Sequence, residues 1–305
     1  MKNIRFKYKN LPPSVWVVIL GLFIVGCEKT INIAPPQYEP KISIQCLLTP
    51  DSFPKLYLDK SVPFFDYKVL PKDLFIPNAS VKITAANGAM DVLKADSIFN
   101  QFYCRYDYFY KGAVKTKANT AYSLEVVVNG QTFKATTSTN LPKAKIETVG
   151  YVQAFSDVYG EHEGVVVTVR DVAGQANFYR YQMIRMIDTS VAGANIKLKS
   201  ACLGRDSILY TEIGRTAFDD IGLDGGIVKM TVEPAFTHKK GVKGVIRVQI
   251  LDENTAAFYN NVDNQKVATY NPFVEPVFLK TQIDGCIGIF GAYILSEPVA
   301  FVYPE

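Results

Sequence analysis

The feature that most constrains the fold of this chain is an alternation of apolar and polar residues over positions 122–137, interrupted at its centre by Asn129-Gly130. A period of two places alternate side chains on opposite faces of a β-strand, so the segment predicts two strands that each bury one face. Asn-Gly favours a type I′ turn, which needs positive φ at both positions and joins the strands of a hairpin. The resulting register pairs Val126 with Phe133 and Leu124 with Ala135 on the apolar face, and Glu125 with Lys134 on the solvent face.

Similar alternation recurs along most of the chain in short runs separated by turn residues. One helix is predicted over Asp252–Lys266, where Asp252 can cap the first turn. Strands do not alternate with long helices, which disfavours an α/β fold, so we predict an all-β chain with one short helix. The further strands are expected within residues 41–48, 56–58, 81–83, 165–170, 178–187, 227–232, 245–251, 277–283 and 287–293.

A break in this pattern at Leu141-Pro142 predicts a boundary between two domains. The first would span residues 41–141 and form a β-sandwich, because short strands separated by turns are typical of that architecture. The second would span residues 142–305 and form another β-rich domain, sandwich or barrel-like.

The first 26 residues are predicted to be a lipoprotein signal peptide. A basic segment precedes an apolar run of eleven residues, Val15–Val25, which is too short for a membrane span of about 20 residues. The run leads into Gly26-Cys27, which resembles the bacterial lipobox and implies that Cys27 is acylated after the leader is cut. Residues 27–40 would then tether the protein to the outer membrane, with the exposed face left open. The alternative is an ordinary signal peptide followed by a chance cysteine.

Charge and residue content disfavour several classes of function. The net charge is +4, and the four basic residues before Cys27 account for all of it, whereas nucleic-acid binders need a basic surplus. The chain has only two histidines, so we predict no catalytic residues, no metal and no cofactor.

Its Gly285, Gly288 and Gly291 lie in a strand-like run, so we expect them to permit bends or close packing rather than to bind a dinucleotide. A buried carboxylate pair would reopen the enzyme hypothesis, with Asp219 and Glu275 as the first candidates.

Four cysteines follow Cys27. Disulfides persist in the oxidising compartments that exported proteins meet, so one bridge in each predicted domain is the leading hypothesis. These bridges would be Cys46–Cys104 and Cys202–Cys286. The alternative is four buried small apolar side chains, because spacing alone does not fix connectivity.

Aromatic residues are densest between Phe99 and Tyr110. If this segment is extended throughout, Tyr103, Arg105 and Phe109 project from one face. Tyrosine, phenylalanine and arginine are enriched at protein interfaces, so these three residues form a candidate interaction surface. The alternative is that the aromatic side chains fill the core or are ordinary strand residues.

Several segments resemble the Bacteroidota lipoproteins of the domain-of-unknown-function 4249 family. The resemblance implies an envelope lipoprotein with an immunoglobulin-like first domain and a β-rich second domain, often encoded beside a TonB-dependent outer-membrane receptor. No catalytic residues carry over, and Cys286 departs from a stretch that is usually glycine-rich. The matching segments are residues 27–31, 56–61, 77–81, 121–126, 133–137, 271–276 and 285–293.

Two functions follow as expectations. The leading one is a non-enzymatic outer-membrane lipoprotein that partners a TonB-dependent nutrient receptor. The alternative is a surface adhesion or envelope-scaffold lipoprotein. Neither needs a nucleic-acid partner.

Overall fold

The computed structural model describes residues 38–63, 69–101, 103–157, 160–188, 207–235, 240–270, 279 and 281–304. Contacts group residues 40–305 into one compact unit, and residues 1–39 into another. The predicted signal peptide, the lipidation site Cys27 and nearly all of the tether therefore lie outside the described residues. Cys202 and Glu275 also lie outside them.

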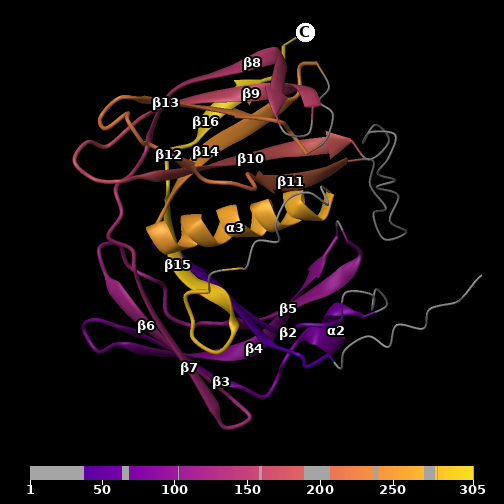
Figure 1. Ribbon diagram of the computed structural model, residues 1–305, viewed down its shortest axis with the longest axis vertical. Coiled ribbons are helices and arrows are strands. Elements are labelled where there is room, and N and C mark those ends of the chain that lie inside the picture. The colour runs from indigo at the N-terminus through magenta and orange to yellow at the C-terminus, as the bar shows by residue number, and fades with distance from the viewer. Residues whose placement is uncertain are drawn as a thin grey trace, which may run out of the picture. The chain divides into compact units, whose positions relative to one another are not determined.

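The described residues are mostly β-strand, with two helices, which confirms the expected β-rich class (Figure 1). The helices are α2 (Pro71–Leu74) and α3 (Glu253–Tyr270). The strands are β1 (Ile42–Leu48), β2 (Lys55–Lys60), β3 (Ser80–Ala85), β4 (Met90–Asn100), β5 (Arg105–Lys111), β6 (Ala121–Val128), β7 (Gln131–Ser138), β8 (Lys145–Asp157), β9 (Gly160–Arg170), β10 (Phe178–Asp188), β11 (Ser207–Ile213), β12 (Phe218–Asp219), β13 (Ile227–Val232), β14 (Lys243–Leu251), β15 (Ile287–Leu295) and β16 (Val299–Val302).

One mixed sheet of 13 strands runs through both halves of the described chain, in the order β11-β10-β14-β15-β1-β2-β5-β4-β3-β6-β7, with β12 beside β10 and β16 beside β14. The link is β15, which pairs in parallel with β1, as Ile44 does with Gly288, and antiparallel with β14, as Leu251 does with Tyr293. A second sheet has three strands in the order β13-β9-β8. Strand β15, near the C-terminus, thus pairs with β1, the first strand that the structure describes.

The described residues form two hydrophobic cores, one built mainly from residues before position 142 and the other mainly from residues after it. The first core contains Ile44 and Leu58 together with Val126, and it also takes in Phe290 from β15. The second core packs the three-stranded sheet against β10 and β14, and buries Val167, Tyr179 and Val248 among others. The boundary predicted at residue 142 stays a prediction, because two separate cores share one continuous sheet.

The predicted hairpin is confirmed in its turn and in its register. Asn129 and Gly130 have φ of 49° and 82°, as a type I′ turn requires. Val126 pairs with Phe133, Leu124 with Ala135 and Glu125 with Lys134. The last pair forms an ion pair at 3.5 Å.

Two glycines of β15 allow the close approaches that this topology needs. A Cβ on Gly288 would lie 1.8 Å from the carbonyl oxygen of Ile44, so a side chain there would clash with β1. A Cβ on Gly291 would lie 1.7 Å from Oγ1 of Thr255, in the first turn of α3. The expectation that these residues serve close packing is confirmed.

The predicted helix is also confirmed, and it is longer than expected. The backbone N–H of Thr255 donates to Oδ1 of Asp252 at 2.9 Å, which is the predicted cap. The other carboxylate oxygen of Asp252 accepts from the backbone N–H of Ala292 at 2.5 Å, so the cap also fastens α3 to β15. By contrast, residues 279 and 281–283, the described part of the strand expected over 277–283, are not in a strand.

Candidate functional site

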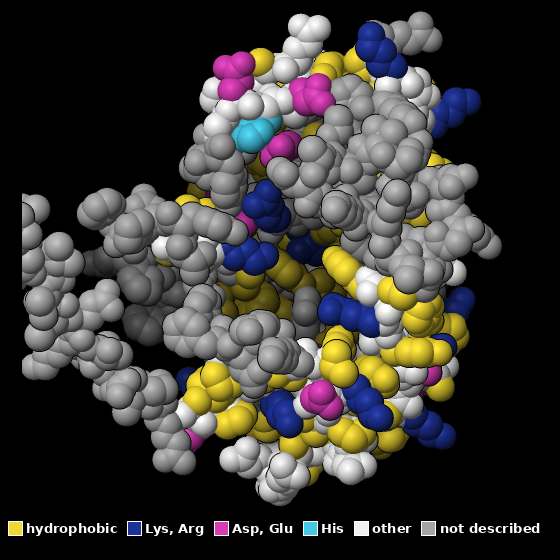
Figure 2. All heavy atoms as spheres, turned by 90° about the vertical axis from the view of Figure 1, so that its right-hand side faces the viewer, with side chains coloured by type: hydrophobic (Ala, Val, Ile, Leu, Met, Phe, Trp, Pro, Cys, Tyr) yellow, Lys and Arg dark blue, Asp and Glu magenta, His cyan; other side chains and the backbone are white. Residues whose placement is uncertain are grey.

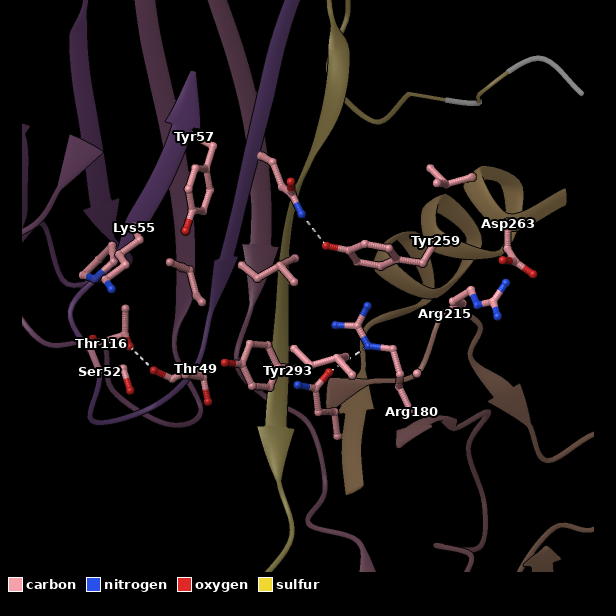
Figure 3. Close-up of a pocket in the computed structure, with 18 of the residues that line it drawn as sticks. Thr49, Ser52, Lys55, Tyr57, Thr116, Arg180, Arg215, Tyr259, Asp263 and Tyr293 are labelled. Atoms are coloured by element: carbon pink, nitrogen blue, oxygen red, sulfur yellow. Dashed lines mark hydrogen bonds between the residues drawn. The ribbon is translucent and has the colours of Figure 1, made fainter. Parts of the chain in front are cut away.

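A cavity of about 620 Å³ lies where the two halves of the large sheet meet, and we call it the junction pocket. Its floor carries Gln45, Tyr57, Arg180, Gln249 and Tyr293, and α3 contributes Tyr259, Asp263 and Lys266 to its wall. Pockets of about 300–1,000 Å³ are typical of sites for small molecules. Figure 3 shows the floor residues and the wall of α3 facing a common space.

The floor is one face of neighbouring strands. Along β10, Tyr179 and Tyr181 point into the second core, so Arg180 projects from the opposite face. In the same way, Gln249 lies opposite Val248 on β14 and pairs in register with Arg180. On β1, Gln45 alternates with buried Ile44 and Cys46 and pairs with Tyr57 of β2. The strand faces that do not fill the two cores therefore form the floor.

Helix α3 covers part of this face, because it packs along β15 between the strands of the two halves (Figure 1). The side-chain amide of Gln45 donates to the hydroxyl oxygen of Tyr259 at 2.5 Å. This contact joins the wall of the pocket to the β1 side of its floor.

Arg180 is the buried cation of the junction pocket. Its residue is only 4% exposed, its guanidinium lies 4.2 Å from the ring centroid of Tyr259, and its Nε donates to Oε1 of Gln249 at 2.8 Å. The amide nitrogen of Gln249 in turn donates to Oε1 of Gln182 at 3.1 Å, which fixes the orientation of the Gln249 amide. No carboxylate of the described residues lies within ion-pair distance of Arg180.

The electrostatic state of Arg180 follows from this burial. Removal from water lowers the pKa of the Arg180 guanidinium, and the phenols of Tyr259 and Tyr293 oppose this only in part. Even so, an arginine keeps its proton in proteins, so a positive charge is held out of water with no neutralising carboxylate among the described residues.

The remaining charges that line the pocket are also mainly basic. Lys55, Arg215 and Lys266 lie around it, and Asp263 is the one acidic residue among those lining it. The Oδ1 atom of Asp263 is buried and has no hydrogen-bond partner. On the face shown in Figure 2, Lys and Arg side chains border a hollow with hydrophobic side chains within it.

A second buried arginine shows the arrangement that Arg180 lacks. Arg185 lies further along β10, and its Nη2 is 3.5 Å from Oε2 of Glu212, with both side chains less than 10% exposed. Burial raises the pKa of the Glu212 carboxyl, and the charge of Arg185 opposes that shift. One strand therefore carries one buried arginine with a carboxylate partner and one without.

The cysteines do not form the two predicted bridges. Cys46 and Cys286 are free and buried, so neither Cys46–Cys104 nor Cys202–Cys286 is present. Cys46 occupies the inner face of β1 as a small apolar side chain, and burial raises the pKa of its thiol to about 12. Cys104 is disulfide-bonded, and its partner lies outside the described residues.

The structure contradicts part of the predicted interaction surface. The segment from Phe99 to Tyr110 is not extended throughout, because β4 ends at Asn100 and β5 begins at Arg105, with Cys104 at a φ of 54° between them. Arg105 and Phe109 share one face of β5, but the ring of Tyr57 packs against Phe109 with the centroids 6.0 Å apart, so Phe109 is only 2% exposed and cannot belong to an exposed surface. Tyr103 and Arg105 remain exposed, with the guanidinium 4.9 Å from the ring centroid.

Two buried carboxylates, Asp171 and Asp220, both accept hydrogen bonds from Asn177, but neither lines the junction pocket. Asp219 is exposed at the end of β12, away from the junction pocket. The nearby Asp171 is buried and accepts hydrogen bonds from Tyr179, Asn177 and the backbone N–H of Gly225, so it holds a loop together. Among the described residues, no three His, Cys, Asp or Glu side chains are grouped as a metal site.

Sequence reasoning missed the junction pocket. The alternation within residues 245–251 is consistent with Gln249 on the face opposite Ile246, Val248 and Ile250, but nothing in the sequence marks that face as covered. Arg180 belongs to no motif. The available signal was a polar residue between two tyrosines in a predicted strand.

Comparisons with known proteins add a family and little else. No curated protein matches the chain. Among solved structures, the crystal structure of a DUF4785 family protein from Legionella pneumophila is similar at 14% identity, over 70% of this chain and 51% of that one, with a TM-score of 0.24. The chain thus spans about half the length of that structure, and a score this low carries no argument.

Within the described residues, no helix has both the length and the apolar composition needed to cross a membrane. A family model described as "Domain of unknown function (DUF4249)" matches residues 28–296, which is most of the chain. The resemblance noted in the sequence is therefore confirmed, and the protein belongs to the DUF4249 family.

Proposed function

We propose that this protein is a non-enzymatic lipoprotein of the outer membrane that captures a small solute and works beside a TonB-dependent nutrient receptor. The observation that carries the capture role is the junction pocket, in which Arg180 is buried, fixed by Gln249 and not neutralised by any carboxylate that the structure describes. Support for the membrane anchor comes from the lipobox-like sequence ending in Cys27.

The proposal includes the finer architecture expected for the chain. The first core would be that of an immunoglobulin-like sandwich and the second that of a sandwich or barrel-like domain. Supporting this, each core is enclosed by faces of strands that alternate buried and exposed residues. The capturing site would then lie between two β-rich bodies, at their shared strand β15.

The partnership is tested by co-purification. A tagged full-length protein, extracted from membranes with mild detergent, is expected to bring down a large β-barrel receptor identified by mass spectrometry. A Cys27→Ala variant serves as the control, because it removes the acyl anchor without touching the folded unit. If no such receptor accompanies the anchored protein, the transport role is wrong.

A second candidate function is surface adhesion or envelope scaffolding. The observation that favours it is a group of exposed apolar side chains where β4 and β5 meet their turn: Ile98 is 53% exposed, Phe99 41% and Tyr106 51%. An adhesion role would depend on these side chains rather than on Arg180. Replacing Tyr106 by serine would then abolish binding to a cell or matrix surface, and Arg180→Met would leave it intact.

A further inference from the structure

We infer that the junction pocket recognises a small solute through an oxyanion group, a carboxylate or a phosphate, held by the guanidinium of Arg180. This inference deepens the proposed function and rests on it for its biological setting.

The first step is that Arg180 is not balanced from within the described protein. A buried charge is ordinarily paired, since an ion that leaves water without a counter-ion is strongly disfavoured. Arg185 on the same strand follows that rule, with Glu212 at 3.5 Å. Arg180 contacts the neutral amide of Gln249 and the ring and neutral hydroxyl of Tyr259, none of which supplies a full negative charge.

The second step is that the guanidinium is oriented for recognition. Its Nε is occupied by Gln249, whose own amide is held by Gln182, so the side chain is fixed before any ligand arrives. Figure 3 shows the other end of the guanidinium directed into the space between Tyr259 and Tyr293. A planar guanidinium presents parallel N–H groups that match the two oxygens of a carboxylate or phosphate.

The third step concerns the sign of the charged residues that line the junction pocket. Among the described residues that line the pocket, Lys55 adds a positive charge to that of Arg180, and Asp263 is the one acidic residue. Such an excess in a concave site attracts anions and repels cations. Tyr57 and Tyr293 supply ring faces and hydroxyls for the uncharged remainder of the solute.

The binding test uses three solutes that share one sugar ring: glucose, glucuronate and glucose 6-phosphate. Full-length protein in detergent is titrated with each by calorimetry at low salt. We expect at least one of the two anions to bind at least about tenfold more tightly than glucose, because a hydrogen bond to a charged group is stronger than one to a neutral group. Whichever anion binds identifies the source of the oxyanion.

Variants then locate the binding. Arg180→Met should weaken the anion by about 10- to 100-fold, and Arg180→Lys should restore part of the loss, because it keeps the charge but not the fork of donors. Arg170→Met is the matched control, since Arg170 is an exposed arginine on β9 that contacts Glu147 outside the pocket. Equal binding of glucose and both anions, no binding of either anion with a Kd below about 1 mM, or an undiminished affinity in Arg180→Met would each overturn the inference.

The two proposals fail separately. If anions bind through Arg180 but no receptor co-purifies, the recognition site stands and the transport role does not. If a receptor co-purifies and the anions do not bind, the partnership stands and the inference about the ligand is wrong.

Discussion

Replacing either buried arginine of β10 by methionine should affect folding stability to very different extents. Arg185→Met leaves the carboxylate of Glu212 buried without its cation, and breaking a buried ion pair from one side costs about 3–5 kcal/mol of folding stability. Arg180→Met removes a hydrogen bond to Gln249 worth about 1.5–3 kcal/mol and a ring contact worth about 0.5–2 kcal/mol. It also relieves a desolvation penalty of several kcal/mol, which offsets those losses. We therefore expect Arg180→Met to stay within about 1 kcal/mol of the natural protein.

Urea denaturation of the three proteins measures this difference. The only tryptophan, Trp16, lies in the predicted leader, so unfolding is followed by tyrosine fluorescence and far-ultraviolet circular dichroism. Arg185→Met should lower the midpoint with an unchanged slope, and Arg180→Met should leave both nearly unchanged.

The dependence on pH gives a second signature. The pKa of Glu212 is already raised by burial, and loss of Arg185 raises it further. A carboxyl whose pKa is raised on folding contributes stability that is present at low pH and is lost as the pH rises through its folded pKa. The deficit of Arg185→Met should therefore be smaller at pH 5 than at pH 8, whereas Arg180→Met should show no such trend. If Arg180→Met is as destabilising as Arg185→Met, the charge of Arg180 is satisfied within the fold and is not held for a ligand.

Three further measurements address other parts of the molecule. Gly130→Ala should destabilise the protein by about 1–2 kcal/mol in the same urea assay, because φ is 82° there, and Gly150→Ala, which has open space and no positive φ, should be close to neutral; equal effects would contradict the turn assignment. A non-reducing peptide map should join Cys104 to Cys202, because Cys46 and Cys286 are free and acylation would occupy Cys27; a map that joins Cys104 to any other cysteine would refute this. Burial raises the pKa of Asp59 to about 6, so this group contributes stability that is lost as the pH rises from about 4 to about 6. Asp59→Asn should flatten that part of the stability profile, and an unaltered profile would show that Asp59 is not the cause.

Local pattern was sufficient to predict much of the secondary structure. The hairpin followed because Asn129-Gly130 and the flanking alternation specify the same register, and the start of α3 followed from one capping residue, Asp252. The strand β8 was missed because its pairing with β9 shifts register twice, between Ile146 and Thr148 and again between Val152 and Phe155. Such irregularities break the alternation on which the prediction depends.

The aromatic segment shows a different failure. The turn between β4 and β5 holds Cys104 at positive φ, where glycine or asparagine is the usual residue, so no turn signal was present in the sequence. The turn does not account for Phe109, which shares a face of β5 with exposed Arg105. Phe109 is buried because Lys55 and Tyr57 of the neighbouring strand β2 cover it, and the sequence pattern does not encode that pairing. A segment that is extended throughout also cannot pair Phe99 with Tyr106, as the two strands do across the turn.

The junction pocket could not be predicted because its residues meet only through the parallel pairing of β15 with β1 and the covering of both by α3. Pairing of this kind depends on strands far apart in sequence, and no local preference encodes it. Alternation does encode that the two faces of a strand lie in different environments. Tyr179 and Tyr181 fill the second core from one face of β10, and Arg180 faces the pocket from the other. Because packing and recognition are separated in this way, a substitution at Arg180 can change what the pocket binds while leaving intact the core that holds the pocket open.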